Sequence, residues 1–363
     1  MAVATITLLA ACSAEKPKPA ELPPNVPLLG VRLAWSAKLP PVTFPLQVDA
    51  SGDILTLASS NGTMIAIDAR TGVENWRVDV GAPIEAGVGS DGSISAVVVK
   101  GNELVAVQGG KIAWRRKLTS EAYTAPLVAG RRVFVLTADR SLSAFDGQSG
   151  RPLWTQTRTP EQLVLRKGGV LVAVGNTLVY GVGGRLVGVN PADGSTRWEA
   201  PVASPRGTND VERLVDLTGS VARDGDVLCV RAYYASIGCV DAVRGTLLWS
   251  RPAVGAEGVT ADDRLVYGSE ANGSVIALRR ADGERAWSSD RLRYRSLSAP
   301  LAVGRSIVVG DGSGLVHVLS RDDGAPQNRL PTDGSAIVAA PVLIGNTVVV
   351  VTQSGGVFGF RPE

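Results

Sequence analysis

The chain has 363 residues, of which 45% are apolar and 20% are charged, and this mixture is typical of a globular protein. The formal net charge is only +3, and the lysines and arginines are scattered without a basic run, which argues against binding to nucleic acid. The sequence contains no run of about 18 apolar residues, so it predicts no membrane-spanning helix.

The N-terminal segment resembles the end of a bacterial lipoprotein signal. Residues 1–11 are apolar, and Leu9-Ala10-Ala11-Cys12 has the pattern of a lipobox, in which the cysteine thiol is acylated. The segment is shorter than the usual ~15–30 residues and lacks a basic start, so we expect the true start codon to lie upstream. We predict a signal peptide over residues 1–11, lipidation at Cys12 and a flexible, proline-rich tether over residues 12–30. The alternative is an ordinary chain end with a chance cysteine.

Seven tryptophans mark a repeat of about 40 residues, a period typical of propellers and solenoids. Most of them follow a short apolar strand and an Asx-Gly turn, as Ile65–Asp68 and Gly72 precede Trp76. Two units depart from the pattern, because one has Asn328 where the tryptophan is expected and the last, residues 357–360, ends before a tryptophan strand. The tryptophans are Trp35, Trp76, Trp114, Trp154, Trp198, Trp249 and Trp287.

The two ends of the chain complement each other. The last unit lacks its outer strand, whereas the first tryptophan strand, residues 31–39, has no unit before it. If the N-terminal strand completes the last unit, the ring closes and no sheet edge is left exposed. The sequence therefore predicts an all-β, eight-bladed β-propeller of four-stranded blades over residues 31–363, closed by the N-terminal strand.

Each unit contains the pattern of four strands. An Ala-Pro segment that ends in glycine predicts the first strand at residues 125–130, 299–304 and 340–345. The second strand is a continuous β-branched run, for example residues 348–351, as expected for a sheet that is covered on both faces. The tryptophan would then pack between adjacent blades, where its N–H group needs a partner.

The unit Ala66-x-Asp68-x-x-Thr71-Gly72-x-x-x-Trp76 resembles the repeat of propellers that bind pyrroloquinoline quinone (PQQ). Quinoprotein dehydrogenases and the BamB family of outer-membrane assembly lipoproteins share this repeat. The length, the lipobox and the eight units over residues 31–360 resemble the BamB family along nearly the whole chain. The resemblance implies a non-enzymatic scaffold of the β-barrel assembly (BAM) complex, without a cofactor and lipid-anchored at the periplasmic face of the outer membrane. The implied partners are the periplasmic POTRA region of BamA, other BAM components and unfolded outer-membrane proteins awaiting insertion.

Two segments sharpen this resemblance. Leu163-Val164-Leu165-Arg166 resembles the family motif Leu-x-Leu-Arg, and residues 208–216 resemble a second family loop, whose further aspartate is replaced here by Thr218. In the family these loops lie together and bind a POTRA domain of BamA. The resemblance implies that the partner-binding residues are Leu163, Leu165, Arg166, Arg213 and Asp216.

Both segments also have a structural interpretation. Leu163 and Leu165 would be buried if they formed the first strand of their blade. Arg213 and Asp216 would order their own loop if they paired inside the propeller. An aspartate near Arg166 could instead pair with that arginine or with a cation of the partner, and such a pair contributes only about 0–1 kcal/mol if it is exposed. We therefore expect the burial of these side chains to separate a docking surface from a core element.

The histidine and the remaining cysteines of the sequence are interpreted as structural residues and not as catalytic ones. His317, the only histidine, lies in an apolar run and predicts a structural role. No cysteine or histidine spacing typical of a metal site is present. Cys229 and Cys239 fall on neighbouring strands of one blade, where they would form either a disulfide in an oxidising periplasm or two small buried thiols.

Two alternative functions remain at this point. A quinoprotein dehydrogenase of this repeat family would need a cofactor floor, a calcium site and adjacent cysteines. The sequence has no adjacent cysteine pair, and 363 residues leave little chain beyond the blades. The second alternative is a lipoprotein propeller that binds another partner of the cell envelope.

Overall fold

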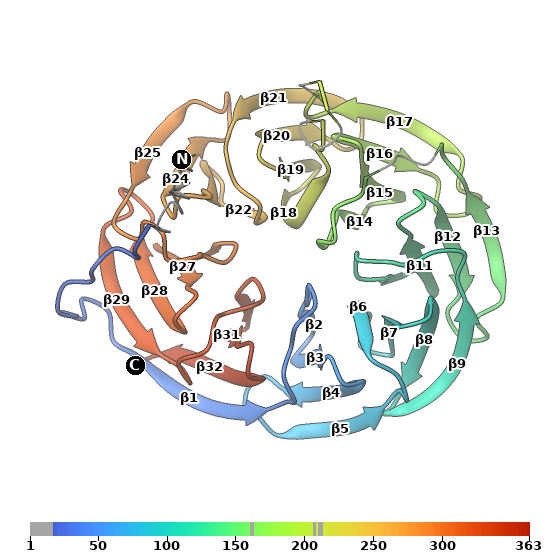
Figure 1. The fold of residues 1–363 in the computed structure, drawn as a ribbon, viewed down its shortest axis with the longest axis horizontal. Helices are drawn as coiled ribbons and strands as arrows, with labels where there is room; N and C mark the ends of the chain where they lie inside the picture. The colour runs from blue at the N-terminus through green and yellow to red at the C-terminus, as the bar shows by residue number, and fades with distance from the viewer. Residues whose placement is uncertain (1–16, 160–162, 206–207, 210–212) are drawn as a thin grey trace, which may run out of the picture.

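The computed structural model describes residues 17–159, 163–205, 208–209 and 213–363. In these ranges the chain forms 32 β-strands and no helix, and the strands make eight four-stranded antiparallel sheets. The sheets surround a central axis as blades, so the predicted eight-bladed propeller is confirmed (Figure 1). No helix long and apolar enough to cross a membrane occurs in the described ranges.

Each blade contains strands A to D, ordered from the axis to the rim. The A strands are β2 (Asp49–Ser51), β6 (Ile84–Ser90), β10 (Leu127–Ala129), β14 (Leu171–Val174), β18 (Leu217–Asp224), β22 (Val259–Ala261), β26 (Leu301–Val303) and β30 (Val342–Ile344). The B strands are β3 (Ile54–Ala58), β7 (Ile94–Val99), β11 (Arg132–Leu136), β15 (Thr177–Val182), β19 (Val227–Ala232), β23 (Leu265–Ser269), β27 (Ser306–Gly310) and β31 (Thr347–Val351).

The outer half of each blade consists of strands C and D. The C strands are β4 (Thr63–Asp68), β8 (Glu103–Gln108), β12 (Leu142–Asp146), β16 (Arg185–Val189), β20 (Ser236–Asp241), β24 (Val275–Arg279), β28 (Leu315–Ser320) and β32 (Gly356–Pro362). The D strands are β5 (Glu74–Asp79), β9 (Lys111–Lys117), β13 (Pro152–Gln156), β17 (Thr196–Pro201), β21 (Thr246–Pro252), β25 (Arg285–Ser289), β29 (Pro326–Pro331) and β1 (Val31–Lys38).

The ring closes through the N-terminal strand. The last sheet has the order β1-β32-β31-β30, so the N-terminal strand is its D strand. The pairing is antiparallel and places Val31 opposite Pro362 and Lys38 opposite Gly356. Figure 1 shows blue β1 beside red β32, so the first and last strands lie in one blade. The predicted closure is thus confirmed.

The tryptophans join each blade to the next. Trp35 packs on Gly72 in the C–D turn of the next blade, where a side chain would approach the indole to 2.8 Å and where φ is +75°. The indole N–H donates to a carbonyl of the same turn, and this bond satisfies a polar group in an otherwise apolar contact. The tryptophans that donate in this way are Trp35, Trp114, Trp154, Trp249 and Trp287, to Ala69, Gly147, Pro191, Arg280 and Arg321.

Asn328 replaces a tryptophan for a topological reason. It lies opposite Val318 as Trp76 lies opposite Ala66, so the two positions are equivalent. The next blade receives its D strand from the N-terminus and therefore has no C–D turn on which an indole could pack. Asn328 instead donates its side-chain N–H to the carbonyl of Leu29, in the segment that enters β1, at 2.8 Å.

The propeller has two distinct ends, because antiparallel strands alternate in direction. The A–B and C–D turns lie at one end, which we call the turn face. The B–C turns and the D–A connections lie at the other end, which we call the loop face. Contacts within the loop face join these elements, since Ala138 in a B–C turn donates to the carbonyl of Glu121 in a D–A connection at 2.7 Å, and Gly312 does the same to Arg295 at 2.8 Å.

Candidate functional site

The two predicted binding segments lie in consecutive D–A connections of the loop face. Residues 163–167 lie between β13 and β14, and residues 213–216 lie just before β18. The first segment precedes β14, which begins at Leu171, so it is not the first strand of its blade. Leu163 is 40% exposed and Leu165 is half-buried. The alternative of a buried strand is therefore wrong for this segment.

Asp216 is buried and holds several parts of the loop face together. One carboxylate oxygen accepts from Nη1 of Arg140 at 2.8 Å and from the amide of Gly183 at 3.3 Å. The other oxygen accepts from the amide of Leu165 at 3.3 Å, and the backbone carbonyl accepts from the amide of Tyr233 at 2.9 Å. The carboxylate thus connects both predicted segments to the B–C turns beside them, and its side chain points into the protein.

Arg140 supplies the cation for Asp216 from an unusual backbone position. It lies in the B–C turn between β11 and β12 with φ at +66°, a left-handed conformation that is unfavourable for a side chain. Gly62 occupies the equivalent position in the first B–C turn, with the same amide-to-carbonyl bond to the residue three positions earlier. Both side chains of the Arg140–Asp216 pair are nearly inaccessible, at 6% and 12% exposure. The pair therefore maintains a strained turn at this point of the ring.

Arg166 remains at the surface, unlike Asp216. Its side chain is 78% exposed, lies over the ring of Tyr123 with 5.5 Å from Cζ to the ring centroid, and approaches Glu121 at 3.6 Å. The Tyr123 hydroxyl donates to Glu121. Burial raises the pKa of Tyr123, and the Glu121 carboxylate raises it further. The guanidinium is therefore held on an aromatic platform while it stays available to a partner.

The remaining predicted residues are distributed differently. Arg213 is exposed, and its amide donates to the carbonyl of Asn209 at 3.2 Å. The buried partner of Asp216 is Arg140 rather than Arg213 or Arg166. Thr218 is buried and donates its hydroxyl to the carbonyl of Ala256 at 3.0 Å. Cys12, the predicted lipidation site, lies outside the described residues.

A small cavity lies behind the first segment. Its volume is about 40 Å³, and its walls include Val164, Leu165, Arg140 and Asp216. A cavity of this size holds at most a few water molecules. It offers no room for a quinone cofactor.

Tyr234 is a surface residue that the sequence interpretation missed. It lies in the B–C turn after β19, next to the Tyr233 amide that binds Asp216, and it is 50% exposed. Its φ of +51° is left-handed, and its amide donates to the carbonyl of Gly255 at 2.9 Å. Lys167 forms an ion pair with Glu257, so the first predicted segment also contacts this side of the loop face. An arginine at a turn position that the first blade gives to Gly62 is the signal that would have revealed Arg140.

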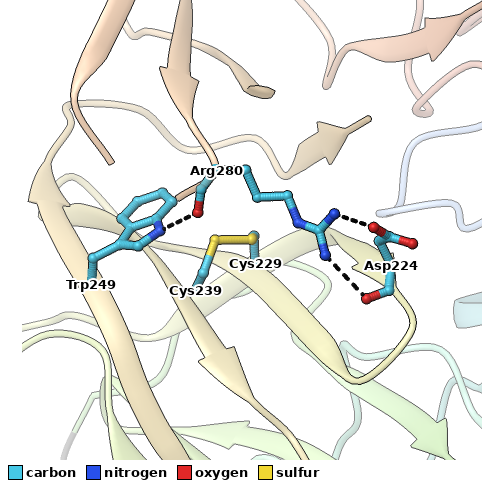
Figure 2. Close-up of a disulfide and its surroundings, with 5 residues drawn as sticks. All are labelled: Asp224, Cys229, Cys239, Trp249 and Arg280. Carbon is cyan, nitrogen blue, oxygen red and sulfur yellow. Dashed lines mark hydrogen bonds and ion pairs between the residues drawn. A yellow bond between two sulfur atoms is a disulfide. The ribbon is translucent and has the colours of Figure 1, made fainter. Parts of the chain in front are cut away.

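The other singled-out residues have structural surroundings. Cys229 and Cys239 lie directly opposite each other on β19 and β20 and are joined as a disulfide, shown with its neighbours in Figure 2. His317 is buried, and its Nε2 lies 2.9 Å from the carboxylate of Asp311. No group of three or more histidine, cysteine, aspartate or glutamate residues within the described ranges could hold a metal ion.

Comparison with known proteins identifies the family. The family model for "Outer membrane protein assembly factor BamB" matches residues 60–289. A relative of that name from Burkholderia pseudomallei is 39% identical over 99% of this chain and 96% of its own length. The crystal structure of BamB from Moraxella catarrhalis has a TM-score of 0.83 at 24% identity, covering 91% of this chain and 99% of that chain. A quinohemoprotein alcohol dehydrogenase from Comamonas testosteroni shares the fold, with a TM-score of 0.71 at 14% identity, over 92% of this chain and 77% of that chain. The chain therefore belongs to the BamB family of outer-membrane protein assembly factors.

Proposed function

We propose that this protein is a non-enzymatic scaffold of the BAM complex that binds the POTRA region of BamA through the loop face. The observation that carries the proposal is the contrast between buried Asp216 and exposed Leu163, Arg166 and Tyr234 around it. A buried ion pair fixes the loops, and an apolar, a cationic and an aromatic side chain are left at the surface. Tyrosine and arginine are enriched among residues that dominate binding energy at interfaces.

Within this proposal the predicted residues have two roles. Leu163 and Arg166 touch the partner, together with Tyr234, and Arg213 adds a charge at the edge of the surface. Asp216 and Arg140 are positioning residues, because their side chains are turned inward. Leu165 has features of both roles, since its amide donates to Asp216 as in a positioning residue, while its half-buried side chain is partly open to a partner. Preorganised loops lose little conformational entropy on binding, and this favours affinity.

The proposed location is the periplasmic face of the outer membrane, with acyl chains on Cys12 as the anchor. Each buried methylene group contributes about 0.8 kcal/mol, so several chains would hold the protein stably. From there the propeller would position BamA and assist the insertion of β-barrel proteins. Direct contact with unfolded barrel substrates and with other BAM components belongs to the same proposal. Purified protein should show no quinone absorbance, and a stoichiometric quinone would contradict the scaffold assignment.

The proposal is tested by a pull-down with the purified POTRA region of BamA. Leu163→Asp together with Arg166→Glu should weaken binding at least about tenfold, because the variant removes apolar contact and reverses a charge at the centre of the surface. The matched control is Val243→Asp together with Arg244→Glu, an exposed Val-Arg pair in a C–D turn of the turn face. The control should bind like the wild type. Equal binding by both variants would show that the partner does not use this surface.

A further inference from the structure

Residues 17–30, which the sequence predicts to be a flexible tether, lie against the blade β26–β29. The amide of Leu28 donates to the carbonyl of Gln327 at 2.7 Å, and the side-chain amide of Asn25 donates to the carbonyl of Arg329 at 3.1 Å. Asn328, at the tryptophan position, binds the carbonyl of Leu29. The segment therefore runs along the outer edge of β29 and covers backbone groups that an edge strand would leave open (Figure 1).

The same segment continues past the end of β29 to the loop face. The amide of Ala20 donates to the carbonyl of Arg293 at 2.9 Å, and its carbonyl accepts from Nη1 of Arg295 at 2.9 Å. Both arginines lie in the D–A connection between β25 and β26. Leu22 packs against the apolar cluster that contains Leu292 and Leu297 in this connection. Backbone bonds at both ends and one apolar contact thus hold the segment in place.

A buried charge cluster fixes the contact between Arg295 and the carbonyl of Ala20 at the loop face. The carboxylate of Asp311 is inaccessible and accepts from Nε of Arg295 at 2.7 Å, and Nε2 of His317 lies 2.9 Å from the same oxygen. The amide of Leu315 donates to the other oxygen at 3.0 Å. The guanidinium that binds the carbonyl of Ala20 is therefore held from behind by the blade itself. A docking contact made by an immobilised side chain costs less side-chain entropy than one made by a free surface arginine.

We infer that residues 17–30 form a docked strap that makes the chain leave the propeller at the loop face, beside the connection between β25 and β26. The inference rests on the proposed lipidation of Cys12, which lies eight residues before Ala20. An extended chain of that length spans at most roughly 27 Å, at about 3.4 Å per residue. The strap would therefore turn the loop face toward the membrane and hold the β25–β29 edge within this distance of it. The candidate docking surface then lies on the membrane-facing side as well, because the connections before β14 and β18 belong to the same face.

Hydrogen–deuterium exchange tests the strap itself in the full-length protein. We expect the amides of Leu28 and Ala20 to exchange at least about tenfold more slowly than in an unstructured peptide of the same sequence. Asn25→Ala combined with Asn328→Ala should raise these rates, while exchange in β27 stays unchanged and shows that the blade is intact. Peptide-like exchange of residues 17–30 in the wild type would overturn the inference.

Energy transfer to the membrane tests the orientation. Lipidated protein is reconstituted in vesicles of phosphatidylethanolamine and phosphatidylglycerol that carry rhodamine-labelled lipid. A fluorophore is attached to Ala271→Cys, in a B–C turn of the loop face, or to Ala281→Cys, in a C–D turn of the same blade; both positions are exposed. We expect clearly stronger transfer from position 271, and a flexible Gly-Ser insertion after residue 16 should leave this difference in place, although transfer weakens at both positions.

Equal transfer from the two positions, or stronger transfer from position 281, would overturn the orientation. Release of the strap by Asn25→Ala and Asn328→Ala together with Arg295→Ala, which removes the bond to the carbonyl of Ala20 at the loop face, should abolish the difference between the positions. Binding of the soluble POTRA region does not require the anchor, so a failed orientation and a failed docking surface give separate results. An unlipidated protein would show no transfer from either position and would remove the premise on which the orientation rests.

Discussion

Two buried aspartates organise the loop face at different parts of the ring. In one cluster the connection supplies the aspartate and the turn supplies the arginine, and in the other cluster these roles are reversed. Asp216 lies in a D–A connection and receives its arginine, Arg140, from a B–C turn. Asp311 lies in a B–C turn and receives Arg295 from a D–A connection. Each carboxylate also accepts backbone amides, so each one ties a turn and a connection into a single unit.

The difference between them lies in what each unit supports. The Asp216 cluster leaves Leu163 and Arg166 exposed beside it, whereas the Asp311 cluster directs Arg295 onto the carbonyl of Ala20 in the strap. The same device thus prepares one region for an external partner and the other for a segment of the same chain. Buried pairs of this kind often contribute little net stability, but removal of one partner leaves an uncompensated charge and is costly.

The sharpest test of the comparison removes the cation from Asp216. Arg140→Gly installs the residue that Gly62 provides in the equivalent turn, so backbone strain is relieved while the ion pair is lost. We expect a net loss of about 3 kcal/mol in the free energy of unfolding, measured by urea denaturation at pH 7. Arg131→Gly is the matched control, because Arg131 is exposed and also left-handed, with φ at +60°.

The control should gain up to about 1 kcal/mol, since only strain is removed. The Arg140→Gly variant should also bind the POTRA region more weakly, because the loops that carry Leu163 and Arg166 lose their fixed position. A variant as stable as the wild type would mean that the Asp216 cluster contributes no more to the fold than an ordinary glycine turn.

The second test removes the charge of Asp311 and is smaller, because an amide can keep part of the hydrogen bonding. Asp311→Asn should lose about 2 kcal/mol at pH 7. Hydrogen bonds from His317, Leu315 and Arg295 hold the pKa of Asp311 below its usual range despite burial. The stabilisation is therefore complete above the unfolded pKa of about 4 and is lost as the pH falls below it.

As the pH falls from 5 to 3, the free energy of unfolding should therefore decrease less in the variant than in the wild type. Urea denaturation midpoints at the two pH values measure this difference. It should also release the strap, which is visible as faster amide exchange at Ala20. A wild-type protein with the same acid dependence as the variant would show that the carboxylate is not stabilised by its neighbours.

The disulfide sharpens the comparison from another direction, because it lies in the hairpin that carries Tyr233 to Asp216. Cys229→Ala with Cys239→Ala opens a loop of ten residues, and we expect a loss of about 2 kcal/mol in the free energy of unfolding. Trp249 packs in the same core cluster and should keep its bond to Arg280, so the tryptophan bands of the near-ultraviolet circular dichroism spectrum should change little (Figure 2). POTRA binding should persist, since the Asp216 cluster is untouched. Lost binding would show that the hairpin and the cluster are not independent.

The propeller could be predicted from the sequence because the same pattern of strands, turns and tryptophans repeats along the chain. The tryptophan spacing, the glycine turns and the missing outer strand of the last unit all point to one closed ring, and β1 pairs with β32 as expected. Asn328 was visible as an exception, but its reason depends on where the chain closes. A proline-rich sequence suggests a free tether, and nothing local to residues 17–30 reveals the edge of β29 that receives them.

The candidate site was only partly predictable, for a similar reason. Leu163 and Arg166 could be singled out by resemblance, and the structure leaves both at the surface. The pairing of Asp216 with Arg140 joins residues 76 positions apart, across two blades, and no local pattern encodes such a contact. The available clue was steric, since an arginine occupies a turn position that other blades give to glycine.

Asp49 is half-buried and has no arginine partner among the described residues, and its replacement gives the smallest expected change in stability, a gain instead of a loss. Burial raises the pKa of Asp49 to about 6, with a further increase from Asp91, although the amide of Ser90 donates to its carboxylate at 3.1 Å and lowers the pKa. Because the folded pKa exceeds the unfolded one, stability declines as the pH rises from about 4 to about 6 and does not recover above that. Asp49→Asn keeps an acceptor for Ser90 and should therefore gain about 1 kcal/mol at pH 7 and nothing at pH 4. Urea denaturation at the two pH values measures both; a loss of stability at pH 7 would mean that the ionised carboxylate at position 49 is supported as well as those of Asp216 and Asp311.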